Sequence, residues 1–261
     1  LSDIVKYAAE NIDVIRGVNF QPISFCGRLE NVTEDHIKNG RTDYAEMMKV
    51  LEKGLDGQIS KEDFYPVPFV YPISKLIEVL KEEKQVEFTA NPMCGGATYV
   101  FVEDGKLTPI TRFMDVEGFV KFIDELSKKS GMLKKVKIVS SFIKNAGKYI
   151  DKEKAPKGLN MTDLIINALT TGDYNSLKAF HYSSLYIGSM WFQDAWNLNI
   201  ERLKRCVIHY STLEGVVPFC AYNGLGIGEK IRKKHSISIK EWEEKTERKL
   251  RDDLWKNGPV N

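Results

Sequence analysis

The stretch GVNFQPISF, residues 17–25, decides the fold class. Its apolar residues alternate only loosely with Asn19, Gln21 and Ser24, which is typical of a strand buried inside an α/β sheet. A Gly-Arg pair at residues 27–28 follows as a turn. In α/β barrels the end of such a strand carries ligand-binding side chains. The stretch therefore predicts an α/β fold in which this strand ends at a ligand site.

Helices and short strands alternate on both sides of this strand. Two prolines exclude helix over residues 64–68. An Asp-Gly pair at residues 104–105 favours a type I′ hairpin over residues 98–110. The apolar periodicity predicts helices over residues 3–14, 43–54, 74–83, 115–129, 135–150, 161–170, 224–234 and 238–255. It predicts strands over residues 86–89 and 185–192, and a second hairpin from residues 207–210 and 216–219.

Composition limits the classes of protein to which the chain can belong. Its 261 residues are enough for about one or two domains. The net charge of +2 argues against nucleic-acid binding through bulk charge. No apolar run reaches the roughly 18 residues of a membrane-spanning helix, and the first residues do not form a signal peptide. The sequence opens at Leu1 without an initiator methionine, so we expect a fragment of a longer protein. Because its cysteines are few, we expect that protein in the reducing cytoplasm.

Four cysteines are too few for a disulfide scaffold in a chain of this length. Because no CxxC or CxxxCxxC motif occurs, any metal site must gather ligands from distant positions. Two glycines follow Cys94, and their N–H groups could face a thiolate or an iron–sulfur cluster; a small buried side chain is the alternative. Cys206 and Cys220 stand at the two ends of the second predicted hairpin. They could share a metal or be unrelated buried thiols.

Polar and glycine-rich segments offer further candidates. Gln21, Ser24 and Arg28 surround the end of the first strand, where an arginine could hold a carboxylate of a polar cofactor; ordinary polarity at a barrel rim is the alternative. GLGIG at residues 224–228 opens a helix, but no Rossmann unit precedes it. The bulky residues 190–192 suit either a core or the wall of an apolar cavity.

Several segments, taken in order, resemble one family. The chain is similar to the C-terminal half of a radical S-adenosylmethionine (SAM) family that includes archaeal tetraether lipid synthases and radical methylases of a dihydropterin. The resemblance extends from about residue 15 to residue 235. The segments that carry it are GVNFQPI (17–23), GR (27–28), DFYPVP (63–68), PMCG (92–95), TYVF (98–101), RFMD (112–115), FQD (192–194), Asn197, RCVIHY (205–210) and PFCAYN (218–223).

The resemblance implies a two-part fold and two cofactors. Residues 1–63 would be the last part of a partial (β/α) radical SAM barrel, and residues 64–261 an α+β domain with an auxiliary iron–sulfur cluster. The CxxxCxxC loop that binds the first [4Fe–4S] cluster would precede Leu1, so the chain alone should be inactive without the N-terminal half of the enzyme. The resemblance places Gln21, Ser24 and Arg28 near SAM, and makes Cys94, Cys206 and Cys220 ligands of an auxiliary [4Fe–4S] cluster.

The function first expected is that of a tetraether lipid synthase. Such an enzyme joins archaeol-type lipid tails at sp³ carbons through a 5′-deoxyadenosyl radical, and we expect an apolar channel beside residues 65–69 and 190–192. Its partners would be the lipid, an electron donor and a peripheral contact with the membrane, with no nucleic acid. One alternative is C-methylation of a dihydropterin in methanopterin biosynthesis, for which a small polar pocket is expected. A non-catalytic iron–sulfur or interaction domain is the other.

Overall fold

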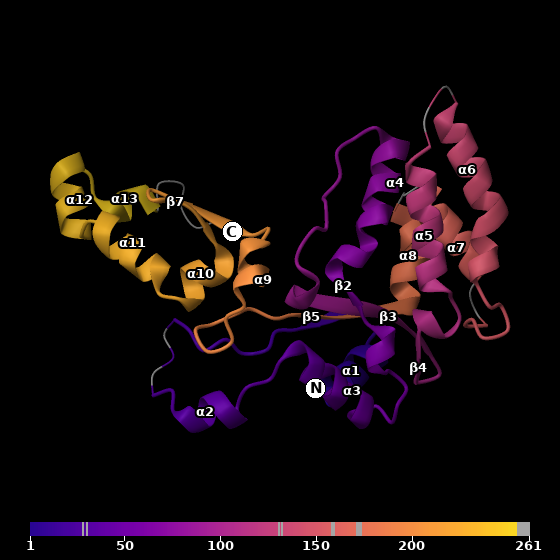
Figure 1. Cartoon of the computed structure of the whole chain (residues 1–261), viewed down its shortest axis with the longest axis horizontal. Helices are drawn as coiled ribbons and strands as arrows, with labels where there is room; N and C mark the ends of the chain where they lie inside the picture. Colours follow the sequence, from indigo (N-terminus) through magenta and orange to yellow (C-terminus); the bar gives the residue numbers. More distant parts are fainter. Residues whose placement is uncertain are drawn as a thin grey trace.

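A computed structural model of the chain describes residues 1–27, 29, 31–129, 131, 133–157, 160–170 and 174–254. A five-stranded mixed sheet with helices on both faces forms its centre (Figure 1). The strand order is β1-β5-β3-β2, with β4 paired to β3. The strands of this sheet are β1 (Gly17–Phe20), β2 (Tyr65–Pro66), β3 (Gly95–Glu103), β4 (Lys106–Pro109) and β5 (Ser184–Met190). A separate hairpin contains β6 (His209–Thr212) and β7 (Gly215–Pro218).

The helices fall into three groups along the chain. The first group is α1 (Ser2–Glu10), α2 (Glu34–Asn39) and α3 (Tyr44–Gly54). The second is α4 (Tyr71–Lys81), α5 (Val116–Ser127), α6 (Lys134–Asn145), α7 (Met161–Thr170) and α8 (Tyr174–Ser183). The third is α9 (Ile200–Lys204), α10 (Phe219–Gly224), α11 (Ile227–His235), α12 (Ile239–Thr246) and α13 (Leu250–Leu254). Short 3-10 helices are η1 (Lys61–Asp63), η2 (Val67–Val70), η3 (Pro92–Cys94), η4 (Ile110–Arg112) and η5 (Ala146–Tyr149).

Each face of the sheet packs on its own apolar core. Neighbouring residues Val100 and Phe101 point to opposite faces, as the two-residue period of a strand requires. Val100 joins Leu185 and Ile187 in a core closed by α1 and α3. Phe101 belongs to the other core, which α4, α5, α6 and α7 cover. The α/β class expected from the sequence is confirmed.

Most expected helices and the first hairpin are present. Asp104 and Gly105 have φ values of 50° and 76°, as the two central residues of a type I′ turn require. The helix expected over residues 238–255 is interrupted, because Glu247 adopts a left-handed conformation between α12 and α13. Helices α2, α8, α9 and α10 were not expected.

Three expected strands or extended segments differ from the structure. The first strand ends at Phe20 rather than residue 25, since Pro22 has no N–H group for a ladder. Residues 67–68 begin η2 instead of staying extended, because proline is tolerated in a first helical turn. No strand forms over residues 86–89. There the chain runs back along α4, held by the Lys75–Glu87 ion pair.

The sheet draws strands from both sides of the expected boundary between residues 63 and 64. Strand β1 pairs in parallel with β5, with Gly17 opposite Tyr186 and Phe20 opposite Ser189. Beyond the ends of these strands lies a group of elements that we call the C-terminal unit, namely α9 to α13 with β6 and β7 (Figure 1). The division into domains stays a prediction. In the described part of the chain, no helix is long and apolar enough to cross a membrane.

Candidate functional site

The candidate site begins where β1 and β5 end. Because these strands are parallel neighbours, the segments that follow them leave the sheet at the same edge. A hydrogen bond joins the two segments, since the Ser24 hydroxyl donates to the carbonyl oxygen of Phe192 at 3.0 Å. The predicted ligand-binding end of the first strand therefore lies against the chain that leads into the C-terminal unit.

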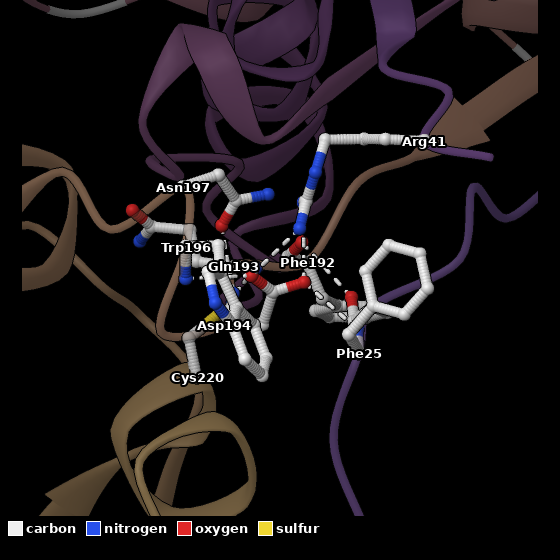
Figure 2. Close-up of polar contacts among 9 residues, drawn as sticks. Phe25, Arg41, Phe192, Gln193, Asp194, Trp196, Asn197 and Cys220 are labelled. Carbon is white, nitrogen blue, oxygen red and sulfur yellow. Dashed lines mark hydrogen bonds and ion pairs between the residues drawn. The ribbon is translucent and has the colours of Figure 1, made fainter. Parts of the chain in front are cut away.

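Asp194 fixes the geometry of this edge (Figure 2). Its side chain is fully buried and accepts two hydrogen bonds from Arg41, each 3.1 Å long. The backbone N–H groups of Phe25 and Trp196 donate to the same carboxylate at 2.8 and 3.0 Å. Four donors saturate the carboxylate, so Asp194 links three separated segments of the chain. The sequence showed Asp194 only as part of a familiar segment and gave no sign of this role.

Two amide side chains next to Asp194 extend the network toward α9. Asn197 accepts a hydrogen bond from the Asp194 N–H through its Oδ1 atom, at 2.7 Å. The buried Gln193 side chain accepts from the Asn199 N–H at 2.6 Å, and Asn199 in turn caps α9. The start of α9 is thereby held at a defined distance from the end of β5.

Cys94 lies at the edge of the sheet, directly before β3. Its carbonyl oxygen accepts a hydrogen bond from the Trp191 N–H at 2.8 Å, which ties it to the end of β5. The two following glycines allow close strand contact. A Cβ atom on Gly95 would lie 2.1 Å from the Ser189 oxygen, and one on Gly96 would lie 2.5 Å from the Tyr65 oxygen. Strand packing alone therefore accounts for both glycines.

Cys206 and Cys220 belong to the C-terminal unit. The hairpin expected between them is confirmed, with His209 opposite Pro218. Cys206 precedes this hairpin, and its thiol donates to the Ile208 carbonyl oxygen at 3.0 Å. Cys220 lies in α10 and is buried, and its sulfur accepts from the Gln193 N–H at 3.4 Å. The latter contact connects the C-terminal unit to the Asp194 network (Figure 2).

One buried cation, Arg202 of α9, contacts the first of the three cysteines, Cys94. Its Nε–H group donates to the sulfur of Cys94 at 3.2 Å. Burial raises the pKa of the Cys220 thiol, while the Gln193 N–H and the charge of Arg202 act to lower it. Cys206 and Cys94 also act on Cys220, in the direction that raises its pKa. Cys220 is therefore the thiol on which the charge of Arg202 and the other two cysteines act.

The donor chemistry of this group suits an iron–sulfur cluster, because thiolates are the protein ligands that such clusters use. The guanidinium among them would favour a bound anion. Within the described ranges, no three His, Cys, Asp or Glu side chains are already arranged to hold a metal ion. The assignment of Cys94, Cys206 and Cys220 as ligands stays a prediction.

A cleft of about 440 Å³ opens beside this region, between the segment after β1 and the α10–α11 pair. Tyr222 forms one wall and stacks on Tyr210, with ring centroids 4.1 Å apart. Arg232 donates to the Tyr222 hydroxyl at 3.1 Å. Charged, amide and aromatic groups thus share one concave surface. Its lining residues are Cys26, Gly27, Tyr222, Asn223, Gly224, Gly226, Glu229 and Arg232.

The GLGIG segment shapes this cleft by permitting close contacts. A Cβ atom on Gly224 would lie 2.7 Å from the Gln193 carbonyl oxygen. One on Gly228 would lie 2.5 Å from the Tyr222 ring. The glycines that suggested a nucleotide loop therefore pack α10 and α11 against the rest of the site.

The residues predicted to lie near SAM are not all described. Ser24 is at the candidate site through its bond to Phe192, and Gln21 is exposed. Arg28 lies outside the described residues. Cys26, which lines the cleft, has a pKa raised by burial and by the charge of Asp194. The role of Gln21, Ser24 and Arg28 in SAM binding stays a prediction.

Comparison with known proteins corrects the expected function. No model of a known protein family matches the chain. Over 246 residues the chain is 44% identical to 7,8-dihydro-6-hydroxymethylpterin dimethyltransferase of Methanocaldococcus jannaschii. The alignment covers 92% of this chain and 48% of that protein, so the chain spans about half the length of the curated relative it matches. The tetraether lipid synthase expectation, with its lipid channel, is wrong on this finding. The relative's name agrees with the dihydropterin alternative.

Proposed function

We propose that this chain is part of a radical SAM methyltransferase that adds methyl groups to carbon atoms of a dihydropterin. The observation that carries the proposal is the 44% identity to a dihydropterin dimethyltransferase over 92% of the chain. The cleft lined by Tyr222 and Glu229 also supports it, because a small polar pocket is what a pterin requires. In the net transfer the S–CH₃ bond of SAM and a C–H bond of the pterin break and a C–CH₃ bond forms. S-adenosylhomocysteine leaves, and the hydrogen of the C–H bond is released as a proton.

We place an auxiliary cluster on Cys94, Cys206 and Cys220. Cys94 comes from the edge of the sheet, whereas the other two come from the C-terminal unit. When bound, such a cluster supplies a store for one electron near the substrate. The chain's contribution is to supply the three thiols and to hold Arg202 against Cys94. An electron donor and the CxxxCxxC cluster remain partners in this proposal.

The pterin is assigned to the cleft on chemical grounds. Its volume of about 440 Å³ is within the range of small-molecule sites. The stacked rings of Tyr222 and Tyr210 offer an aromatic surface to a flat bicyclic ligand. Glu229 can accept from the two neighbouring N–H donors of a pterin's pyrimidine ring. A hydrogen bond from Lys233 lowers the pKa of Glu229, so the carboxylate is ionised at neutral pH.

The SAM site is kept at Gln21, Ser24 and Arg28. Gln21 and Ser24 precede Cys26 and Gly27, which line the same cleft. A methyl donor bound there would therefore lie next to the pterin. The proximity matters because a group-transfer step depends strongly on the alignment of donor and acceptor.

The test uses the protein made from its complete gene, purified without oxygen and reconstituted with iron and sulfide. It is incubated with a reductant, with SAM labelled in its methyl group, and with 7,8-dihydro-6-hydroxymethylpterin. We expect labelled methyl groups on the pterin, detected by mass spectrometry. A protein fully loaded with iron that leaves the pterin unlabelled would refute the proposal.

A further inference from the structure

Arg202 is a buried cation without an acidic partner in the described part of the chain. Only 3% of its surface is exposed. Its Nη2 atom donates to the Trp191 carbonyl oxygen, and its guanidinium carbon lies 4.8 Å from the centre of the Trp191 ring. Its Nη1 atom is buried and has no hydrogen-bond partner. A buried guanidinium in such surroundings is strongly unfavourable unless an anion compensates it.

The position of Arg202 is fixed by its backbone as well as by its side chain. The Asn199 side chain accepts from the Arg202 N–H at 2.9 Å, and Gln193 holds Asn199 in place. The guanidinium is therefore directed to its site by α9 rather than drawn there by a carboxylate. A cation held in this way is prepared for an anion that arrives from outside the chain.

The groups that face Arg202 identify the class of that anion. Cys94 contacts it directly at 3.2 Å. Gln193, which holds the Asn199 cap of α9, also donates its N–H to the sulfur of Cys220. Neutral thiols cannot balance the charge. An oxidised [4Fe–4S] core carries two positive charges, and three thiolate ligands carry three negative charges. A cluster bound by the three thiolates therefore has one net negative charge and is an anion. Reduction of the cluster adds one more negative charge.

We propose that Arg202 is the counter-charge of an auxiliary iron–sulfur cluster bound by Cys94, Cys206 and Cys220. This inference rests on the proposed function. Arg202 acts as a positioning residue that donates to the sulfur of Cys94 and stabilises the reduced, more negative state of the cluster. A fixed positive charge and N–H donors near a cluster raise its reduction potential.

The experiment compares three variants of the protein made from its complete gene, reconstituted with iron and sulfide. Arg202→Lys keeps the charge, Arg202→Met removes it, and Arg205→Met removes an equal charge from an exposed side chain one position before Cys206. The signal of the auxiliary cluster is identified as the one lost in Cys220→Ala. Its midpoint potential is measured by redox titration with electron paramagnetic resonance, independently of activity.

We expect a more negative potential in Arg202→Met, an intermediate or unchanged value in Arg202→Lys and no shift in Arg205→Met. Loss of the cluster in Arg202→Met but not in Arg202→Lys would also support the counter-charge. Equal potentials in Arg202→Met and Arg205→Met would overturn it, as would loss of the cluster in both Arg202 variants. If no iron is lost on replacing Cys94, Cys206 or Cys220, the cluster assignment itself fails, and the counter-charge with it. Failure of the cluster assignment can be told apart from failure of the proposed function, because methylation of the pterin is measured in the same samples.

Discussion

At the scale of single residues, the buried carboxylate of Asp194 holds the candidate site together. We predict that Asp194→Asn lowers the free energy of unfolding by about 3 kcal/mol, because breaking a buried ion pair leaves the partner charge uncompensated. The Arg41 side chain is 18% exposed, so solvent screens part of this cost and keeps it at the lower end of the range. Denaturant unfolding followed by circular dichroism measures the change.

A matched substitution tests whether the loss of stability in Asp194→Asn comes from the buried network or from the removal of a negative charge alone. Glu46 pairs with Lys49 at 3.5 Å on the exposed face of α3, and Glu46→Gln should cost less than about 0.5 kcal/mol. If Asp194→Asn were to lose less than about 1 kcal/mol, the Asp194 network would not be what holds the segment after β1.

At the scale of elements, the contact between α10 and α11 shapes the cleft. We predict that Gly228→Ala weakens binding of 7,8-dihydro-6-hydroxymethylpterin about tenfold, or about 1.4 kcal/mol. The added Cβ would lie 2.5 Å from the Tyr222 ring, which must then move off Tyr210 and change the wall of the cleft. Calorimetric titration of the complete protein gives the Kd.

Gly228→Ala should weaken binding of the pterin without weakening helix α11, which makes the test specific. Alanine is the better helix former by about 1 kcal/mol, so α11 itself should not be weakened. Lys230→Ala, on the exposed part of the same helix, should leave the Kd unchanged. A tenfold loss in Lys230→Ala, or none in Gly228→Ala, would argue that the pterin binds elsewhere.

Elements with a local signal could be predicted from the sequence. The β3–β4 hairpin followed from its Asp-Gly turn, and α3 followed from the cap at Asp43. Helix α10 was missed because its six residues are too few to show a helical period. The false strand over residues 86–89 had the right residue types, but this segment pairs with no strand and its Glu87 forms an ion pair with Lys75 of α4.

The candidate site could be predicted only in part, because its central residues are defined by contacts between distant parts of the sequence. Cysteines and a polar strand end are visible as residue types. The structure brings Ser24 and Cys94 to the segment that follows β5, and Cys220 contacts the same segment from α10. Asp194 and Arg202 are defined by contacts with residues 153 and 108 positions away. No pattern in a single sequence reports partners at such separations.

At the scale of the whole molecule, the proposed ligands come from two parts of the fold. Cys94 lies at the edge of the central sheet, whereas Cys206 and Cys220 belong to the C-terminal unit. In the described residues, the direct links between these parts at the site include the bonds of Arg202 to Cys94 and of Gln193 to Cys220. A bound cluster would add covalent links across the same junction.

We therefore predict that iron loading protects the C-terminal unit against hydrogen exchange. Binding to the native state alone stabilises it by about 2.7 kcal/mol at a hundredfold excess over Kd, and metal sites of this kind couple binding to folding. Amide exchange read by mass spectrometry should slow in β6, β7 and α10 of the loaded protein, and return to the faster rate after chelation.

Two cysteine variants serve as controls. Cys94→Ala should abolish this protection, although Cys94 lies at the edge of the sheet and not in the C-terminal unit. Cys26→Ala, which removes the one cysteine not assigned to the cluster, should retain it. Equal exchange in loaded and chelated protein would mean that the three thiols do not join the two parts through a cluster.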